Sequence, residues 1–139
     1  MENWPQFDST CLLGIDAIDR QHRRLFEIAG RVYENLSGGD EAHAAVASTA
    51  AELLDYTATH FADEEAMMQS AGYPGLEAHR REHAELLSKV HDMEMRAGFG
   101  ERSLPADMSR FLLAWLVGHI RTSDRKFGEH LAAQQGKDL

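Results

Sequence analysis

Apolar residues recur along most of the chain at alternating steps of three and four, a spacing that places them on one face of an α-helix. Short segments rich in glycine separate four such stripes: Ser37-Gly38-Gly39, Ala71-Gly72-Tyr73-Pro74-Gly75 and Gly98-Phe99-Gly100. Glycine and proline interrupt helices, so each segment ends one helix and allows another to begin. The pattern therefore predicts four helices, at about residues 17–37, 41–70, 76–97 and 105–124.

Four helices joined by short loops indicate an all-α fold, an antiparallel four-helix bundle with up-down-up-down topology. We expect a single domain over residues 1–139. Residues 1–15 have no helical period and contain Trp4, Pro5 and Phe7, so we expect an extended N-terminal arm that packs aromatic rings onto the bundle. Asp16 should cap the first helix, with the acidic Asp19 three positions on. Residues 125–139 should form a short tail with one further helical piece.

The composition narrows the range of partners. The net charge of −9 repels nucleic-acid phosphates and anionic lipid, which argues against both. The N-terminus lacks the basic start and apolar run of a signal peptide, and the longest apolar run, residues 111–117, is too short to span a bilayer. Cys11 is the only cysteine, so no disulfide forms within the chain and the reducing cytoplasm is the expected location.

Histidines occupy positions on the stripes where apolar residues would be expected. All four predicted helices contribute to the set, which also includes one glutamate: His22, His60, Glu64, His79, His83 and His119. Buried polar groups need partners, and a buried unpaired carboxylate is costly. Five imidazoles and a carboxylate that point into one core satisfy one another most economically through bound metal. The remaining histidines, His43, His91 and His130, lie off the stripes or far from this set, and we expect them to face solvent.

The local spacings suit metal binding. His79 and His83, like His60 and Glu64, are four residues apart and project from one helical face. His119 and Asp124 are five apart, which on a regular helix turns them about 140° away from each other. Two arrangements would bring both inward. One is a single wide turn with i to i+5 backbone bonding between about Leu116 and Arg125, and the other is a helix that ends near Arg121.

Four motifs resemble those of the hemerythrin family, in particular its bacteriohemerythrins. Residues 19–26, Asp-Arg-Gln-His-Arg-Arg-Leu-Phe, are similar to the family's first-helix histidine motif. Residues 60–68 match H-F-x-x-E-E-x-x-M, residues 79–83 match H-x-x-x-H, and residues 115–124 match W-x-x-x-H-I-x-x-x-D. The resemblance covers about residues 10 to 127, and all seven ligand positions of the family are filled in order.

The resemblance implies a non-haem di-iron centre that binds dioxygen reversibly, for storage, delivery or sensing. Glu64 and Asp124 would bridge the irons beside an oxo or hydroxo group. His79, His83 and His119 would hold one iron, and His22 and His60 the other, which keeps one vacant position for oxygen. The residues that match the family's oxygen pocket are apolar: Leu25, Phe61, Met68, Leu116 and Ile120, with Trp115 packed nearby. Phe127 matches a position where some relatives carry an aromatic hydroxyl.

Such a pocket offers no proton for cleavage of the O–O bond, so we expect a binding protein rather than an enzyme. The first alternative is a di-iron enzyme or iron-handling protein that reduces peroxide, oxidises ferrous iron or reacts with nitric oxide. Ferritin-like proteins of that class use Glu-x-x-His pairs, a spacing that no ligand pair has here. The second alternative is a sensor of oxygen or redox state, and the third is a zinc site, since imidazole also suits zinc.

Overall fold

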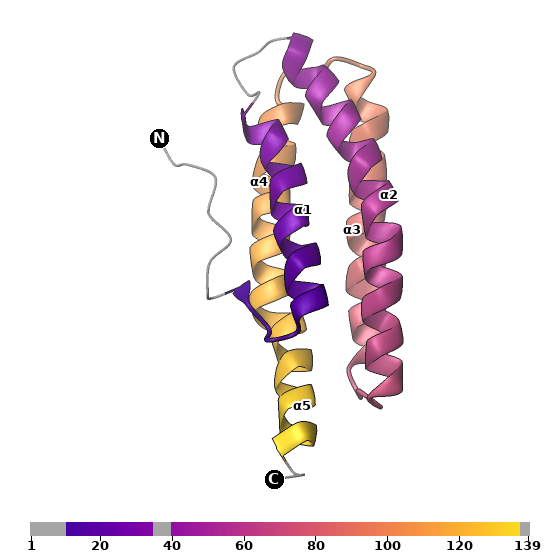
Figure 1. Ribbon diagram of the computed structural model, residues 1–139. Coiled ribbons are helices and arrows are strands. Elements are labelled where there is room, and N and C mark those ends of the chain that lie inside the picture. The colour runs from indigo at the N-terminus through magenta and orange to yellow at the C-terminus, as the bar shows by residue number, and fades with distance from the viewer. Residues whose placement is uncertain (1–10, 35–39, 137–139) are drawn as a thin grey trace.

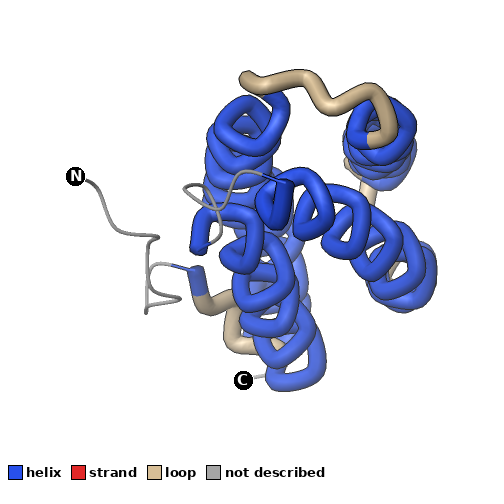
Figure 2. Tube along the Cα trace, turned by 90° about the horizontal axis from the view of Figure 1, so that it is seen from above, coloured by secondary structure: helices blue, strands red, loops and turns tan. Residues whose placement is uncertain are grey.

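The computed structural model describes residues 11–34 and 40–136, and their regular structure is helical throughout. The helices are α1 (Asp16–Glu34), α2 (Asp40–Ser70), α3 (Leu76–Ala97), α4 (Leu104–Gly118), η2 (His119–Asp124) and α5 (Arg125–Gly136). Helix α1 packs against α2 and α4, and α2 packs along α3 (Figure 1). Seen from above, the four long helices stand around a common axis (Figure 2). The predicted all-α bundle is confirmed. Trp4, Pro5 and Phe7 of the expected arm lie outside the described residues.

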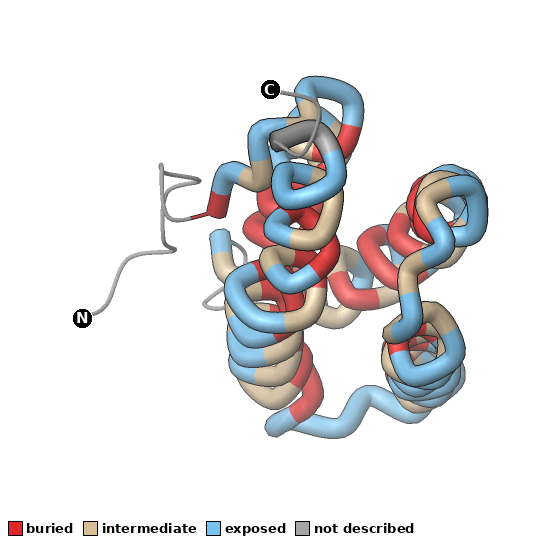
Figure 3. Tube along the Cα trace, turned by 90° about the horizontal axis from the view of Figure 1, so that it is seen from below, coloured by how far each residue is buried: buried red, intermediate tan, exposed pale blue. Residues whose placement is uncertain are grey.

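The inward stripes form the core, and the buried positions lie on the sides of the helices that face the interior (Figure 3). The largest apolar contributions come from all four long helices: Leu25, Ile28 and Val32; Val46 and Leu53; Leu86 and Val90; Met108, Leu112 and Leu116. Burial of one such side chain stabilises the fold by about 1.5–3 kcal/mol. Along α2 and α3 the apolar residues occupy one half of the bundle and the histidines replace them in the other half. The buried interior is therefore polar at the end of the bundle where α1 begins and α2 ends.

The segment before α1 is held by the first turn of that helix. The carboxylate of Asp19 accepts hydrogen bonds from the backbone N–H of Leu13 at 2.8 Å and of Gly14 at 3.1 Å. Gly14 has a φ of +86°, a left-handed conformation that glycine adopts without strain. Leu13 packs against Gly128 of α5, where an added Cβ would lie 3.3 Å from the Leu13 carbonyl oxygen. Asp19 thus fixes the entry of the chain into the bundle.

Between α4 and α5 the helix widens into one π-helical turn, η2, over His119–Asp124. The amide of Arg125 donates to the carbonyl of Ile120, five residues earlier. Of the two arrangements that the sequence left open, the wide turn is confirmed. The helix does not end near Arg121, because α5 continues from it and buries Phe127 against Tyr73, with 5.2 Å between the ring centroids.

The expectation that three histidines face solvent is wrong for two of them. His91 is 63% exposed, but His43 and His130 are half-buried. Ring nitrogens of these two lie against the backbone carbonyls of Glu101 and Ala71, respectively. Both partners are carbonyls at chain turns about 60 residues away in sequence, which helical periodicity cannot reveal. Among the described residues, no helix is both long and apolar enough to cross a membrane.

Candidate metal centre

The structure brings all seven predicted ligands into one buried cluster. Helix α1 contributes one, α2 and α3 two each, and the π-turn η2 two: His22; His60 and Glu64; His79 and His83; His119 and Asp124. None of them is more than 5% exposed. The wide turn is what places His119 and Asp124 on the same side, because five residues then make about one full turn instead of overshooting it.

The two oxygens of Glu64 face two different groups of histidines. Oε1 lies 2.6 Å from Nε2 of His79 and 3.2 Å from Nε2 of His83. Oε2 lies 3.4 Å from Nε2 of His22 and 3.4 Å from Nε2 of His60. The carboxylate therefore stands between two sets of imidazole nitrogens, with one oxygen toward each.

The two oxygens of Asp124 also face two different groups of histidines. Its Oδ1 lies 2.8 Å from Nε2 of His79 and 3.2 Å from Nε2 of His119, and its Oδ2 lies 3.0 Å from Nε2 of His22. The cluster thus has a three-histidine end, formed by His79, His83 and His119, and a two-histidine end, formed by His22 and His60. Both carboxylates reach both ends.

The donor set contains two groups of side chains, each of which could hold a metal ion. Two ligand atoms at about 2.1 Å from one ion and at right angles lie about 3 Å apart, which is the range of the contacts above. Several of these atoms are buried and have no hydrogen-bond partner: both ring nitrogens of His22, Nε2 of His83 and His119, Oε2 of Glu64 and both oxygens of Asp124. Buried polar atoms without partners are rare and call for an explanation. Bound ions between these atoms would satisfy nearly all of them.

The close packing of histidines and carboxylates also shifts their pKa values. Burial lowers the pKa of His22, but the close carboxylates of Asp124 and Glu64 outweigh burial and raise that pKa to about 9. The pKa of His79 is raised to about 9 by the same balance, whereas burial lowers the pKa of His60 to about 4. Burial and the Asp124 charge work against ionisation of Glu64, yet its histidine partners lower its pKa to about 2. The carboxylates therefore stay ionised and available to a cation.

Three polar residues that the sequence analysis did not single out hold the outer ring nitrogens. Nδ1 of His60 lies 2.7 Å from Oε1 of Gln21, Nδ1 of His83 lies 2.8 Å from Oε2 of Glu65, and Nδ1 of His119 lies 3.1 Å from Oε1 of Glu82. Gln21, Glu65 and Glu82 follow or precede the ligands His22, Glu64 and His83 directly in sequence. Their position next to a ligand in the sequence could have singled them out. Each of them, however, bonds a histidine on a helix other than its own, which the sequence does not show.

Of the residues predicted for the oxygen pocket, Phe61 and Trp115 lie against histidines of the cluster. Leu25, Phe61, Met68, Leu116 and Ile120 are buried, and Trp115 is half-buried. The ring of Phe61 stacks on that of His83, with centroids 3.7 Å apart and planes 4° from parallel. Trp115 stacks on His119 at 4.3 Å. These two aromatic rings therefore lie against the three-histidine end, although the Phe61 ring centroid is also 5.5 Å from that of His60.

Comparisons with known proteins agree with this arrangement. Residues 13–131 match the family model of the hemerythrin HHE cation binding domain. A bacteriohemerythrin from Stenotrophomonas maltophilia is 36% identical over 121 residues, which cover 87% of this chain and 77% of the relative. A bacteriohemerythrin from Pseudomonas aeruginosa is 37% identical over 111 residues, covering 80% and 71%. A crystal structure of wild-type hemerythrin superposes with a TM-score of 0.75 at 28% identity, covering 94% of this chain and 98% of that chain.

Proposed function

Because this chain belongs to the hemerythrin family, we propose that it binds dioxygen reversibly at a pair of non-haem iron ions. The observation that best supports two ions is the division of the carboxylate oxygens between the two ends. If the site held a single ion, neither carboxylate would have to face both groups of histidines. His79, His83 and His119 would hold one iron and His22 and His60 the other, with Glu64 and Asp124 as bridges.

The two ends differ in the number of protein donors that they offer. The three-histidine end has three imidazoles and two carboxylate oxygens, whereas the two-histidine end has one imidazole fewer. The vacant position for oxygen is therefore expected at the two-histidine end, on the iron held by His22 and His60. A pair of ferrous ions held by these residues would supply the two electrons that oxygen takes up on binding.

The surrounding side chains favour binding over further oxidation. Leu25, Phe61, Met68, Leu116 and Ile120 are apolar and buried, so they exclude water and offer no proton. Cleavage of an O–O bond is assisted by a positioned acid, and these residues provide none. Oxygen would consequently leave as it entered, which is the behaviour of a storage, delivery or sensing protein.

The test is the absorption spectrum of the reduced, iron-loaded protein before exposure to air, in air and after removal of oxygen. We expect a charge-transfer band that appears with oxygen and disappears under vacuum, together with two irons per chain by elemental analysis. His60→Ala should abolish the band, whereas His91→Ala, a change at an exposed histidine outside the cluster, should leave it unchanged. Irreversible bleaching would favour a di-iron enzyme, and a preparation that holds mainly zinc would contradict the proposal.

A further inference from the structure

The outer partners of the cluster are distributed unequally between its two ends. At the three-histidine end, His83 and His119 each contact a carboxylate, from Glu65 and Glu82. At the two-histidine end, His60 contacts the neutral amide of Gln21, and Nδ1 of His22 has no hydrogen-bond partner among the described residues. The outer group that faces Nδ1 is therefore a charged carboxylate at the three-histidine end and a neutral amide at the two-histidine end.

The chemistry of each acceptor fixes the tautomer of its histidine. A carboxylate only accepts hydrogen bonds, so Nδ1 of His83 and of His119 must carry the proton, and Nε2 keeps its lone pair for the cluster. The amide nitrogen of Gln21 donates to Asp63 at 3.1 Å, which turns its oxygen toward His60. His60 is thereby set in the same tautomer without a charge.

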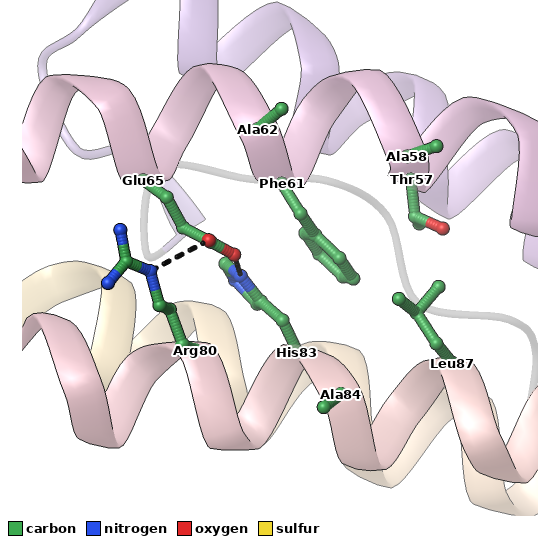
Figure 4. Close-up of a pocket in the computed structure, with 9 residues that line it drawn as sticks. All are labelled: Thr57, Ala58, Phe61, Ala62, Glu65, Arg80, His83, Ala84 and Leu87. Carbon is green, nitrogen blue, oxygen red and sulfur yellow. Dashed lines mark hydrogen bonds and ion pairs between the residues drawn. The ribbon is translucent and has the colours of Figure 1, made fainter.

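Both carboxylates are held in place by residues outside the cluster. Figure 4 shows Glu65 between His83 and Arg80, which donates from Nε to Oε1 at 3.2 Å while Oε2 faces His83. Arg80 also pairs with Glu77, so two carboxylates share this one guanidinium and negative charge remains beside His83. Glu65 borders an open cavity of about 300 Å³ between α2 and α3 and is 23% exposed.

Glu82 is fixed by the π-turn itself. Ser123, inside η2, donates from Oγ to both oxygens of Glu82, at 2.6 and 2.9 Å. The residue therefore connects α3 to the turn that carries His119 and Asp124. Loss of its charge would leave the serine contact possible, because an amide oxygen also accepts from a hydroxyl.

From this geometry we propose that Glu65 and Glu82 are positioning residues that orient His83 and His119 and make the three-histidine end the more electron-rich metal site. A hydrogen bond from Nδ1–H to a carboxylate raises the basicity of the imidazole, and loss of such a partner typically weakens metal binding about 10–100-fold. At the two-histidine end, Gln21 orients His60 but adds no negative charge. The inference rests on the proposed di-iron function, since it concerns how the same site treats its two ions.

Three variants and one control test the proposal. Glu65→Gln and Glu82→Gln keep the size and the acceptor oxygen but remove the charge. The control is Glu85→Gln, which removes the charge of an exposed glutamate on the same helix as Glu82 and His83. Gln21→Glu adds a charge opposite His60 and serves as the reciprocal change.

The first readout is the ¹H–¹⁵N spectrum of the histidine rings in the zinc-loaded protein, which is diamagnetic. We expect Glu65→Gln to move the Nδ1–H signal of His83 upfield and to leave the signal of His119 unchanged. Glu82→Gln should do the reverse, and Glu85→Gln should move neither signal. The second readout is zinc affinity by chelator competition, with a loss of about 10–100-fold in either Gln variant and a gain in Gln21→Glu. A purely structural role would lower thermal stability without this residue-specific pattern.

The outcomes separate the two proposals. If the parent protein fails to bind two ions, the di-iron function is wrong. If the parent binds two ions but Glu65→Gln and Glu82→Gln match Glu85→Gln in both readouts, the positioning role is wrong and the di-iron function stands. Glu65→Gln reports on His83 and Glu82→Gln reports on His119. If one of these variants fails to fold, the other still tests the positioning role.

Discussion

Replacement of Glu64 by glutamine should reduce the metal content of the protein from two ions per chain to one. In the parent, Oε1 faces His79 and His83 while Oε2 faces His22 and His60. A glutamine side chain has one oxygen and one NH₂ group, and the NH₂ group cannot bind a cation. Only one end of the cluster can therefore keep this ligand.

We expect the two-histidine end to lose its ion, because it starts with fewer donors. Without Glu64 it has His22, His60 and one oxygen of Asp124, whereas the other end retains three imidazoles and Asp124. With free metal at a thousand times its dissociation constant, one bound ion stabilises the fold by about 4 kcal/mol. In a protein of this length, the loss of one ion should lower the melting temperature by roughly 10 °C.

The measurement is elemental analysis of cobalt-loaded protein after gel filtration, combined with thermal unfolding in the presence of excess metal. Glu85→Gln is the matched control, since it makes the same chemical change at an exposed residue outside the cluster and should still bind two ions. Two ions bound to Glu64→Gln with the affinity of the parent would refute the bridging role of this carboxylate.

Three further results are expected. His79→Ala removes the nitrogen nearest to both carboxylates, so it should bind less iron and melt at a lower temperature than the metal-loaded parent; equal melting curves would count against its role as a ligand. Leu116→Ala opens a cavity at a fully buried position, which should lower the free energy of unfolding by about 2–5 kcal/mol and speed autoxidation in air, and an unchanged autoxidation rate would place the oxygen pocket elsewhere. In metal-free protein, the raised pKa values of His22 and His79, about 9 against 6.5 unfolded, mean that the folded state binds extra protons, so stability should fall as pH rises from 6.5 to 9. The lowered pKa of His60, about 4, should make stability fall on the acid side as well, and urea titrations that show no maximum near pH 6.5 would contradict both shifts.

The sequence predicts the helices and the inward direction of the ligands because both follow from one periodicity. His22, His60, Glu64, His79 and His83 each replace an apolar residue on a stripe, so the same spacing that indicates a core position also directs them to the cluster. Asp124 is different. Its distance of five residues from His119 does not fit a regular helix, and the sequence only shows that the backbone must depart from regularity there.

Contacts between helices account for what the sequence left undecided. The wide turn and the early end of the helix both bring Asp124 inward, and the choice depends on packing of Phe127 against Tyr73 beyond the turn. Likewise, Glu65 and Glu82 look like ordinary surface charges next to ligands. Their role depends on the register between α2, α3 and η2, which no pattern within one helix specifies.

The order of the ligands along the chain has a consequence for biosynthesis. His22 is translated first, and Asp124, which supplies one oxygen to each end of the cluster, comes last, about a hundred residues later. Because domains emerge from the ribosome with the N-terminal part first, a nascent chain exposes histidines and a single carboxylate before any complete site exists. We therefore expect iron to be captured only after η2 has been released and has docked, so that maturation of this protein is a post-translational event.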